Sequence, residues 1–311
     1  MDHDVPADHD VIVIGGSFAG MSAATYVARA RRSVCVIDTG LPRNRFAAHS
    51  HGFFGHDGAK PADMLATARS QLIVYPEVTF IEDKAVDANK SEDGFSVILA
   101  TGKTLAAKRL VLAYGMSDEL PDIPGLAERW GKSVAQCPYC HGYEFGGRKL
   151  GVLYHSPLSI HHVQIVSEWG PTTFLLNGST ELDDSQLATL RQRGIEIEPA
   201  PVCALRGDGD LLSAVELDDE RKLEIEALFI GSTPRFNSDL ADRLGCEIDA
   251  GSYGSIIRTD PMKMTTVPGV FAAGDITRLA YNVTWACSDG VMAGSAAHRS
   301  LIFPDEMTKA A

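Results

Sequence analysis

The sequence predicts an α/β fold in which parallel strands are buried between helices. Two observations carry this prediction. An apolar strand, a glycine-rich turn, a helix and a second strand follow one another over residues 10–38, and the order strand–helix–strand returns over residues 149–176. Continuous apolar runs are typical of parallel strands that are covered on both faces. The chain has 311 residues, 45% of them hydrophobic, so it can bury a large core and suggests about two domains.

The first glycine-rich turn follows a strand over 10–14 and opens a helix over 21–30. It reads Gly15, Gly16, Ser17, Phe18, Ala19 and Gly20. The next strand, 33–37, ends at Asp38, which lies 18 residues after Gly20. In dinucleotide-binding domains such glycines let a diphosphate reach the helix N-terminus, and the acid binds ribose hydroxyls. Ser17 stands where the pattern has its middle glycine. Strand, helix and acid are in register, which favours a dinucleotide site over an ordinary βαβ turn.

A long loop over 41–59 comes next and is rich in arginine, histidine and glycine. Arg43 and Asn44 could reach the phosphate or the ring of a bound cofactor. His49, His51 and His56 suggest a metal site, but their spacing comes without a helix or carboxylate ligands, so we predict no metal. A helix over 61–74 and strands over 78–81, 95–99 and 108–113 complete this part of the chain.

Cys137-Pro138-Tyr139-Cys140 is the one close pair among six cysteines. Half of a Cys₄ zinc site would need a second close pair, and Cys35, Cys203, Cys246 and Cys287 are scattered singly. A static disulfide is disfavoured in a chain without a secretory signal. At a helix N-terminus one of two such thiols becomes a stabilised thiolate. We therefore predict a redox-active dithiol, with Pro138 and Tyr139 in a turn.

The chain crosses into a second domain over 121–125 and returns over 230–234, so that the second domain carries the dithiol. A strand over 149–154, a helix over 159–169 and a strand over 173–176 form its βαβ unit, and residues 223–229 lead into the return crossing. The turn over 154–159 has no glycine, and 175–181 has no cationic residue. Close approach to a diphosphate needs glycine, and a 2′-phosphate needs arginine. The nucleotide-domain fold is thus predicted without its usual ligand-binding chemistry.

The last segment, 269–275, ends in Gly274-Asp275 and precedes a helix over 285–298. A strand that ends in Gly-Asp can place a carboxylate on a sugar-alcohol hydroxyl. The N-terminus of the following helix can stabilise a ring edge that becomes anionic on reduction.

The net charge of −13 argues against nonspecific nucleic-acid binding, because phosphate contacts need a basic face. No apolar run approaches the ~20 residues of a membrane span. The polar segment 1–10 is not expected to be a signal peptide, so we expect a cytoplasmic protein.

Taken together, the motifs resemble the thioredoxin reductase-like FAD-dependent pyridine nucleotide-disulfide oxidoreductases along nearly the whole chain. Residues Gly15–Gly20, Asp38, Cys137–Cys140, Gly269–Asp275 and the two crossings carry the resemblance. It implies two Rossmann-like, three-layer ββα domains: an FAD domain over 1–118 and 232–311, split by an inserted NADPH-type domain over 119–231. It also implies noncovalent FAD and a homodimer. Cys140 is then expected to face the flavin and Cys137 to exchange with substrate.

More closely, residues 137–144 resemble a subgroup that includes the dithiol oxidases of holomycin- and gliotoxin-type pathways. His141 takes the place of the aspartate that is the family's proton donor. Histidine can serve as acid or base near neutral pH, although the position can also be a simple turn residue. Tyr114 replaces the threonine of an Ala-Thr-Gly, and residues 281–284 replace an Arg-Gln-Ala.

Three functions remain open on the sequence. The first is an FAD-dependent dithiol oxidase that passes electrons from a small dithiol through Cys137 and Cys140 to oxygen, with NADPH doubtful. The second is a reductase of thioredoxin or a similar disulfide, fed by NADPH or by another donor such as ferredoxin. The third is a flavin-bound redox sensor.

Overall fold

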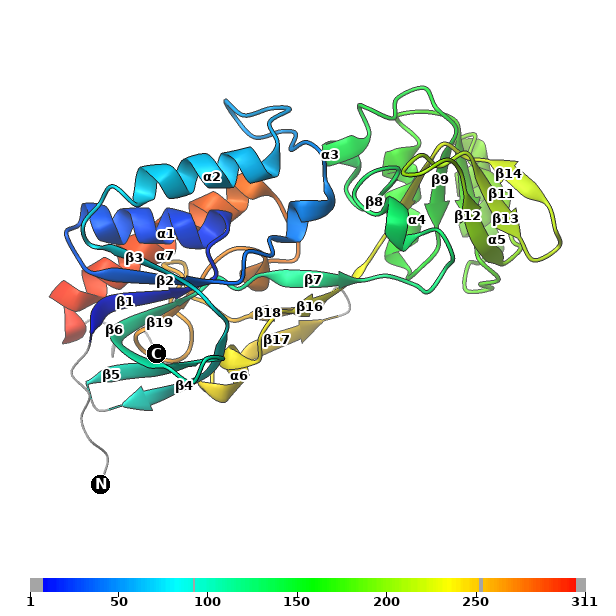
Figure 1. The fold of residues 1–311 in the computed structure, drawn as a ribbon. Coiled ribbons are helices and arrows are strands. Elements are labelled where there is room, and N and C mark those ends of the chain that lie inside the picture. Colours follow the sequence, from blue (N-terminus) through cyan, green and yellow to red (C-terminus); the bar gives the residue numbers. More distant parts are fainter. Residues whose placement is uncertain (1–7, 92, 252–253, 306–311) are drawn as a thin grey trace. The chain divides into compact units, whose positions relative to one another are not determined.

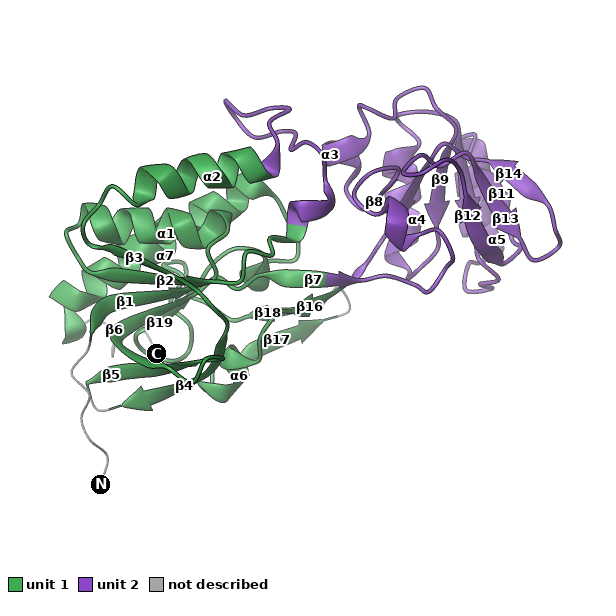
Figure 2. Ribbon diagram, viewed as in Figure 1, with its two compact units in different colours: residues 1–43, 62–117, 234–311 green, residues 44–61, 118–233 purple. Residues whose placement is uncertain are grey.

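The computed structural model describes residues 8–91, 93–251 and 254–305. Residues 1–7, part of the segment expected not to be a signal peptide, lie outside this range. The chain divides into two compact units (Figure 2). Unit 1 comprises 1–43, 62–117 and 234–311, and unit 2 comprises 44–61 and 118–233. Unit 2 thus holds the loop 44–61, which the sequence analysis placed with the first part of the chain, in addition to the inserted segment.

Unit 1 is built on a seven-stranded sheet (Figure 1). Its order is β3 (Val78–Glu82), β2 (Val34–Asp38), β1 (His9–Ile14), β6 (Thr104–Leu112), β5 (Gly94–Leu99) and β4 (Ala85–Ser91), with β19 (Val270–Ala272) also paired to β6. The strands β3, β2, β1, β6 and β19 run parallel, whereas β6, β5 and β4 form an antiparallel meander. The parallel strands are those that carry the first nucleotide-binding motif.

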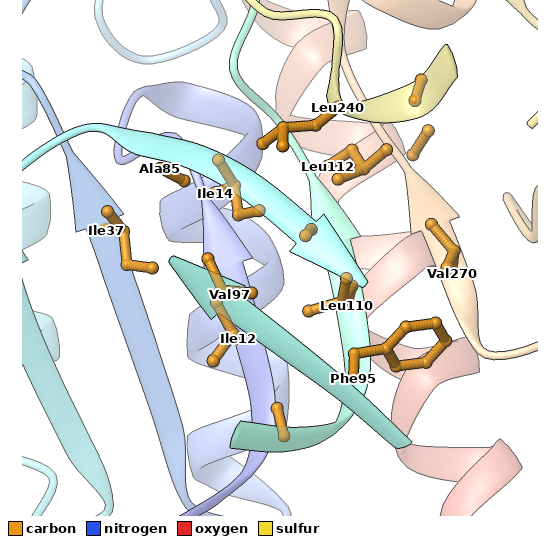
Figure 3. Packing of buried hydrophobic residues seen from close by; sticks show 14 of the residues in the cluster. Ile12, Ile14, Ile37, Ala85, Phe95, Val97, Leu110, Leu112, Leu240 and Val270 are labelled. Atoms are coloured by element: carbon orange, nitrogen blue, oxygen red, sulfur yellow. The ribbon is translucent and has the colours of Figure 1, made fainter. Parts of the chain in front are cut away.

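Successive residues of β1 enter different cores, because side chains alternate across a strand. Ile12 and Ile14 belong to a cluster with Phe95 and Val97 of the meander, which Figure 3 shows from close by. Val11 and Val13 face the opposite side and pack against the helices. The buried apolar run predicted from the sequence therefore reflects a strand covered on both faces.

The helices on this face of unit 1 are α1 (Phe18–Arg29), α2 (Pro61–Leu72) and α7 (Val283–Ile302). Its short helices are α6 (Leu240–Arg243) and η3 (Asp275–Thr277), and its remaining strands are β17 (Ile248–Gly251) and β18 (Gly254–Ile257). Three short elements span the division between the units: η1 (Arg43–Phe46), β7 (Met116–Glu119) and β16 (Thr233–Phe236). A Cβ on Gly290 or Gly294 of α7 would overlap the backbone of α1 at Ala19 and Ala23. These small residues let α1 and α7 pack in close contact.

Unit 2 contains a parallel sheet, an antiparallel sheet and helices. The parallel sheet has the order β11 (Glu196–Glu198), β10 (Thr172–Leu175), β9 (Leu150–Leu153), β15 (Ala227–Ile230) and β8 (Val134–Ala135). The antiparallel sheet is β12 (Val202–Arg206), β13 (Ala214–Leu217) and β14 (Lys222–Glu224), and the helices are η2 (Ala127–Arg129), α3 (Pro138–His141), α4 (Leu158–Val166) and α5 (Asp184–Gln192). One core joins the two sheets and another joins the parallel sheet to α4 and α5. The predicted three-layer α/β architecture is confirmed in both units.

The structure corrects one local expectation and adds elements that the sequence had not indicated. Residues 223–229 contain parts of β14 and β15, which pair in different sheets. Pro138 and Tyr139 form the first turn of helix α3 rather than a simple turn. The helix α5 had not been predicted, although Asp183 and Gln186 form a reciprocal capping box at its start. In the described part of the chain, no helix is long and apolar enough to span a membrane.

Candidate active site

The glycine-rich turn between β1 and α1 has a shape that only glycine permits at two positions. Gly15 has φ +108°, and a Cβ there would overlap the carbonyl of Ala113 at the end of β6. A Cβ on Gly20 would overlap the carbonyl oxygen of Gly15. The first turn of α1 therefore lies directly against the strand ends, which brings its amides to the edge of the sheet.

The N-terminus of α1 is open to an anionic group. Its N-cap, Ser17, makes no side-chain capping bond, and the amides of Phe18, Ala19 and Gly20 have no acceptor among the described residues. Asp38, at the end of β2, has its Oδ1 2.9 Å from the amide of Gly16, which donates to it. The turn is thus braced by the acid, while the helix amides remain available to a diphosphate.

Gly274 and Asp275 lie beside this turn. A Cβ on Gly274, whose φ is +81°, would come within 3.0 Å of the Ala19 Cβ. The Asp275 carboxylate accepts a hydrogen bond of 2.9 Å from Arg43, and both side chains are less than one fifth exposed. The Arg43 guanidinium also lies 4.1 Å from the ring centroid of Tyr281. Arg43, Asp275 and the α1 turn are therefore brought together, whereas Asn44 falls in unit 2, where its carbonyl accepts from the amide of Ala47.

The sequence analysis did not predict the ion-pair cluster around Asp289 of α7. Asp289 of α7 is 3% exposed and lies 2.7 Å from the Lys263 ammonium and 2.6 Å from the Arg278 guanidinium. Burial alone would raise the pKa of Asp289, but the hydrogen bonds from Arg278 and Lys263 outweigh it, and the pKa is lowered. In the sequence, Asp289 is an acid within a helix of mostly small and apolar residues, and this pattern does not reveal its partners.

These features fit an FAD dinucleotide. The open amides at the start of α1 would hold the diphosphate, with Asp38 at the adjacent strand end. The Asp275 carboxylate would accept a hydrogen bond from a hydroxyl of the sugar-alcohol chain while it remains paired with Arg43.

The dithiol lies in unit 2, where Cys137 caps helix α3 and Cys140 sits within it. All six cysteines of the chain are free thiols. The Cys140 thiol donates a hydrogen bond to Cys137, and this bond, with the amides of Cys140 and Tyr139, lowers the pKa of Cys137 to about 7. Because the shared proton stays on Cys140, the pKa of Cys140 is raised. The reduced pair therefore holds its negative charge on Cys137.

Aromatic packing fixes the helix that carries the thiols. The ring of Tyr139 meets Trp169 edge to face at 5.7 Å, and a Cβ on Gly142 would press into the same indole. Phe145 packs against Phe229 of β15, with ring centroids 5.8 Å apart. The dithiol is thus held on the rigid parallel sheet of its own unit.

His141 lies beside the dithiol with its ring stacked on Phe145 at 6.1 Å. Its Nδ1 is buried and has no hydrogen-bond partner among the described residues. Burial lowers the pKa of His141 from its ordinary value of 6.5, so the imidazole is neutral at pH 7. A neutral imidazole with an unpaired nitrogen is suited to accept a proton from a thiol.

The turn at the start of α4, where a second dinucleotide would be expected, is closed by the chain itself. The Ser159 hydroxyl accepts from the amides of His155 (3.0 Å) and Ser156 (3.3 Å). The amides of Ser159 and Ile160 donate to the carbonyls of Ser156 and Pro157, and Pro157 has no backbone N–H. This turn therefore contrasts with the open turn at α1.

A tyrosine–glutamate pair lies at the strand ends beside the closed turn. Tyr154, directly after β9, donates a hydrogen bond to the carboxylate of Glu181, which follows β10. A dinucleotide 2′-phosphate would need a cation at such a strand end, and here a carboxylate stands instead.

Within the residues that the structure describes, no group of three or more His, Cys, Asp or Glu side chains is arranged to hold a metal ion. His51 instead contacts carboxylates of its own unit, and His56 stacks on Phe53 with ring centroids 5.4 Å apart.

Comparison with known proteins places this architecture in a family. The pyridine nucleotide-disulphide oxidoreductase family model matches residues 9–166 and 171–300. The chain is 33% identical to the thioredoxin reductase tcpT of Claviceps purpurea and 30% identical to the thioredoxin reductase sirT of Leptosphaeria maculans, over 94% and 93% of both chains respectively. The crystal structure of an oxidoreductase from Agrobacterium tumefaciens superposes with a TM-score of 0.91 at 46% identity, covering 95% of this chain and 99% of that one.

The match covers nearly the whole chain, including the open α1 turn, the Gly274-Asp275 segment and the dithiol. The chain belongs to the pyridine nucleotide-disulphide oxidoreductase family and is an FAD-dependent disulfide oxidoreductase of the thioredoxin reductase type.

Proposed function

We propose that the protein is a dithiol oxidase, which converts a small dithiol to a disulfide through Cys137 and Cys140 with oxygen as final electron acceptor and without NADPH. The observation that carries the proposal is the turn at α4, where the amides of His155 and Ser156 donate to the Ser159 hydroxyl and those of Ser159 and Ile160 donate to backbone carbonyls. Each charge-assisted hydrogen bond that NADPH would lose there is worth about 1.5–3 kcal/mol. Losing several of them would weaken binding by orders of magnitude.

The thiols can perform the exchange in the direction of oxidation. A deprotonated substrate thiol attacks Sγ of Cys137 in the enzyme disulfide and expels Cys140. The second substrate thiol then attacks its own mixed disulfide and expels Cys137. A thiol of low pKa leaves faster, and the pKa of Cys137 is lowered to about 7 by the Cys140 thiol. One disulfide forms in the substrate and one is broken in the enzyme.

His141 is proposed to take a proton from the substrate thiol, because only the thiolate is nucleophilic. Burial keeps its imidazole neutral, and its Nδ1 has no partner in the described structure. When bound, FAD supplies the two-electron carrier between the dithiol and oxygen. The names of the relatives favour the alternative of a thioredoxin reductase, in which NADPH or another donor drives the same thiols in reverse.

Anaerobic stopped-flow measurement separates the two functions. The oxidised protein is mixed with NADPH or with dithiothreitol, and the flavin absorbance is followed. We expect dithiothreitol to bleach the flavin and NADPH to leave it oxidised. Cys137→Ser and Cys140→Ser should block the reaction with dithiothreitol, because both thiols are needed for the exchange. On admission of oxygen the absorbance should return, with one hydrogen peroxide formed for each dithiol oxidised.

Rapid and saturable bleaching by NADPH would overturn the proposal and assign the protein as a thioredoxin-type reductase. Bleaching by dithiothreitol that survives in both cysteine variants would show that the dithiol is bypassed.

A further inference from the structure

A small closed loop in unit 2 presents one histidine to the dithiol segment. The loop is tied at its base by the amide of Ser50, which donates to the carbonyl of Ala59 at 2.8 Å. Inside it, Asp57 accepts a hydrogen bond of 2.8 Å from the amide of Gly52. These bonds give the loop a defined shape without a helix or strand, and they fix the position of His51.

His51 lies between two carboxylates. Its Nδ1 is 3.5 Å from Asp57, and its Nε2 is 3.5 Å from Glu144, which follows helix α3. The exposed fractions of the three side chains are 24% for His51, 39% for Glu144 and 74% for Asp57. Two other titratable groups act on this imidazole. The ring centroid of His49 lies 6.3 Å from that of His51, and His141 interacts with His51 electrostatically. Nε2 of His51 thus faces Glu144 on the dithiol side, and Nδ1 faces the exposed Asp57.

Glu144 connects this histidine to the thiols. It follows His141 by three residues in the chain, and its charge acts in the direction of raising the pKa of both His141 and Cys140. The order His141, Glu144, His51 and Asp57 therefore leads from the partly buried dithiol to an exposed carboxylate. Each member belongs to unit 2.

The exchange reaction leaves a proton to be removed. Two S–H protons leave the substrate for every disulfide formed in it. Above pH ~7 the reduced enzyme pair keeps one of them on Cys140, because Cys137 remains a thiolate. One proton must then leave the site in each turnover. An imidazole can take up a proton at one nitrogen and release it from the other, which suits the position between two carboxylates.

We propose that His51 is a proton-transfer residue, which carries the proton from His141 and Glu144 to Asp57 and solvent. The proposal rests on the disulfide exchange at Cys137 and Cys140 and on His141 as the base, and not on the absence of an NADPH site. It is independent of which acceptor finally takes the electrons.

The test follows proton release directly. FAD-loaded, oxidised protein in weak buffer with a pH-indicator dye is mixed anaerobically with dithiothreitol, and dye and flavin absorbance are recorded together. In the wild type we expect proton release to keep pace with exchange. His51→Gln keeps a polar side chain but cannot relay a proton, and should slow release roughly 10-fold or more. His51→Ala should be slowed equally and recover on addition of imidazole.

His56→Gln is the matched control, because His56 lies in the same loop but stacks on Phe53. Its proton release should equal that of the wild type. Glu144→Gln interrupts the path from the other side and does not depend on how the loop tolerates a change at His51. Proton release in the double variant His51→Gln/Glu144→Gln should be no slower than in either single variant, because both residues act on one path.

Unchanged proton release in both His51→Gln and Glu144→Gln would overturn the proposal. Slowed release in His51→Ala that imidazole does not restore would assign His51 a structural role only. Because NADPH and oxygen are absent from this experiment, its outcome is separate from that of the oxidase proposal.

Discussion

At the scale of single residues, the asymmetry between the two thiols is the feature that matters most for chemistry. The Cys140 thiol donates to Cys137, so the pKa of Cys137 is lowered to about 7 and that of Cys140 is raised. A low pKa makes Cys137 both the reactive nucleophile and the better leaving group. This is consistent with the expectation that Cys137 exchanges with substrate.

The asymmetry predicts the pH dependence of alkylation. In the reduced protein, reaction of Cys137 with iodoacetamide should reach half its maximum near pH 7, because only the thiolate reacts. Cys140→Ala removes the largest cause of the shift, so the midpoint should move up toward the ordinary value of 9. Mass spectrometry of the peptide that contains Cys137 measures it.

Cys203→Ala serves as the control, because Cys203 is an exposed, separate thiol. In Cys203→Ala, the pH of half-maximal alkylation of Cys137 should match that of the wild type. An unshifted midpoint in Cys140→Ala would show that the backbone amides of α3, and not the neighbouring thiol, set the acidity of Cys137.

At the scale of elements, two helix starts with the same connection to a parallel sheet behave differently. At α1 the amides of Phe18, Ala19 and Gly20 have no acceptor among the described residues. At α4 the hydroxyl of Ser159 turns back onto the amides before the helix. The difference is one of side-chain chemistry within a common βαβ unit, because Ser159 binds amides at α4 whereas the corresponding Ser17 at α1 makes no side-chain capping bond.

The α1 turn gives a direct test of cofactor binding. Gly20→Ala should lower the bound FAD well below one per chain, because its Cβ would overlap the carbonyl of Gly15 and force the helix away from the strand. Overpacking of this kind costs roughly 1–3 kcal/mol. Released flavin per chain and urea unfolding measure the two effects.

Gly231→Ala is the matched control, since no heavy atom lies within 4 Å of a Cβ at that glycine. It should keep both FAD and stability. Full FAD content in Gly20→Ala would show that the close approach of α1 to β1 is not needed for binding.

At the scale of the whole molecule, the two units have separate cores. The clusters around Ile12 and Val11 contain residues of unit 1 only, and those around Leu153 and Val152 contain residues of unit 2 only. Each unit also buries charge. Asp289 is clamped by Lys263 and Arg278 in unit 1, whereas Arg129 donates to three backbone carbonyls in unit 2.

Separate cores predict two unfolding transitions in calorimetry. Removal of FAD should lower only the transition of unit 1, because a ligand stabilises the part that binds it. Asp289→Asn should lower the same transition by about 1.5–3 kcal/mol, since it weakens charge-assisted hydrogen bonds from two partly buried cations. Arg129→Met should lower the other transition.

Acid should act on unit 1 in the same way. The pKa of Asp289 is lowered in the folded state, so its contribution is present above the unfolded value near 3.9 and is lost as pH falls through the folded pKa. Asp289→Asn should remove this part of the pH dependence. A single cooperative transition, lowered alike by removal of FAD, by Asp289→Asn and by Arg129→Met, would contradict the independent unfolding of the units.

The local motifs could be predicted from the sequence because each lies within a short stretch of chain. The turn over 15–20, Asp38 and the Cys137–Cys140 pair are defined by spacing along one βαβ unit or one helical turn. The α/β class followed from apolar strands separated by helices, and both three-layer units have it. The absence of glycine over 154–159 predicts a poor second dinucleotide site, and this stays a prediction.

Tertiary structure alone decided which distant residues meet. The pairs Arg43–Asp275, Tyr154–Glu181 and His51–Glu144 join segments that nothing in their spacing connects. The division of 223–229 into β14 and β15 depends on two sheets competing for adjacent residues. Local propensity acts over a few residues, whereas these contacts form only when packed cores bring remote parts of the chain together. The sequence by itself therefore determined the family and its dithiol, and the folded chain determined how charge and protons are arranged around them.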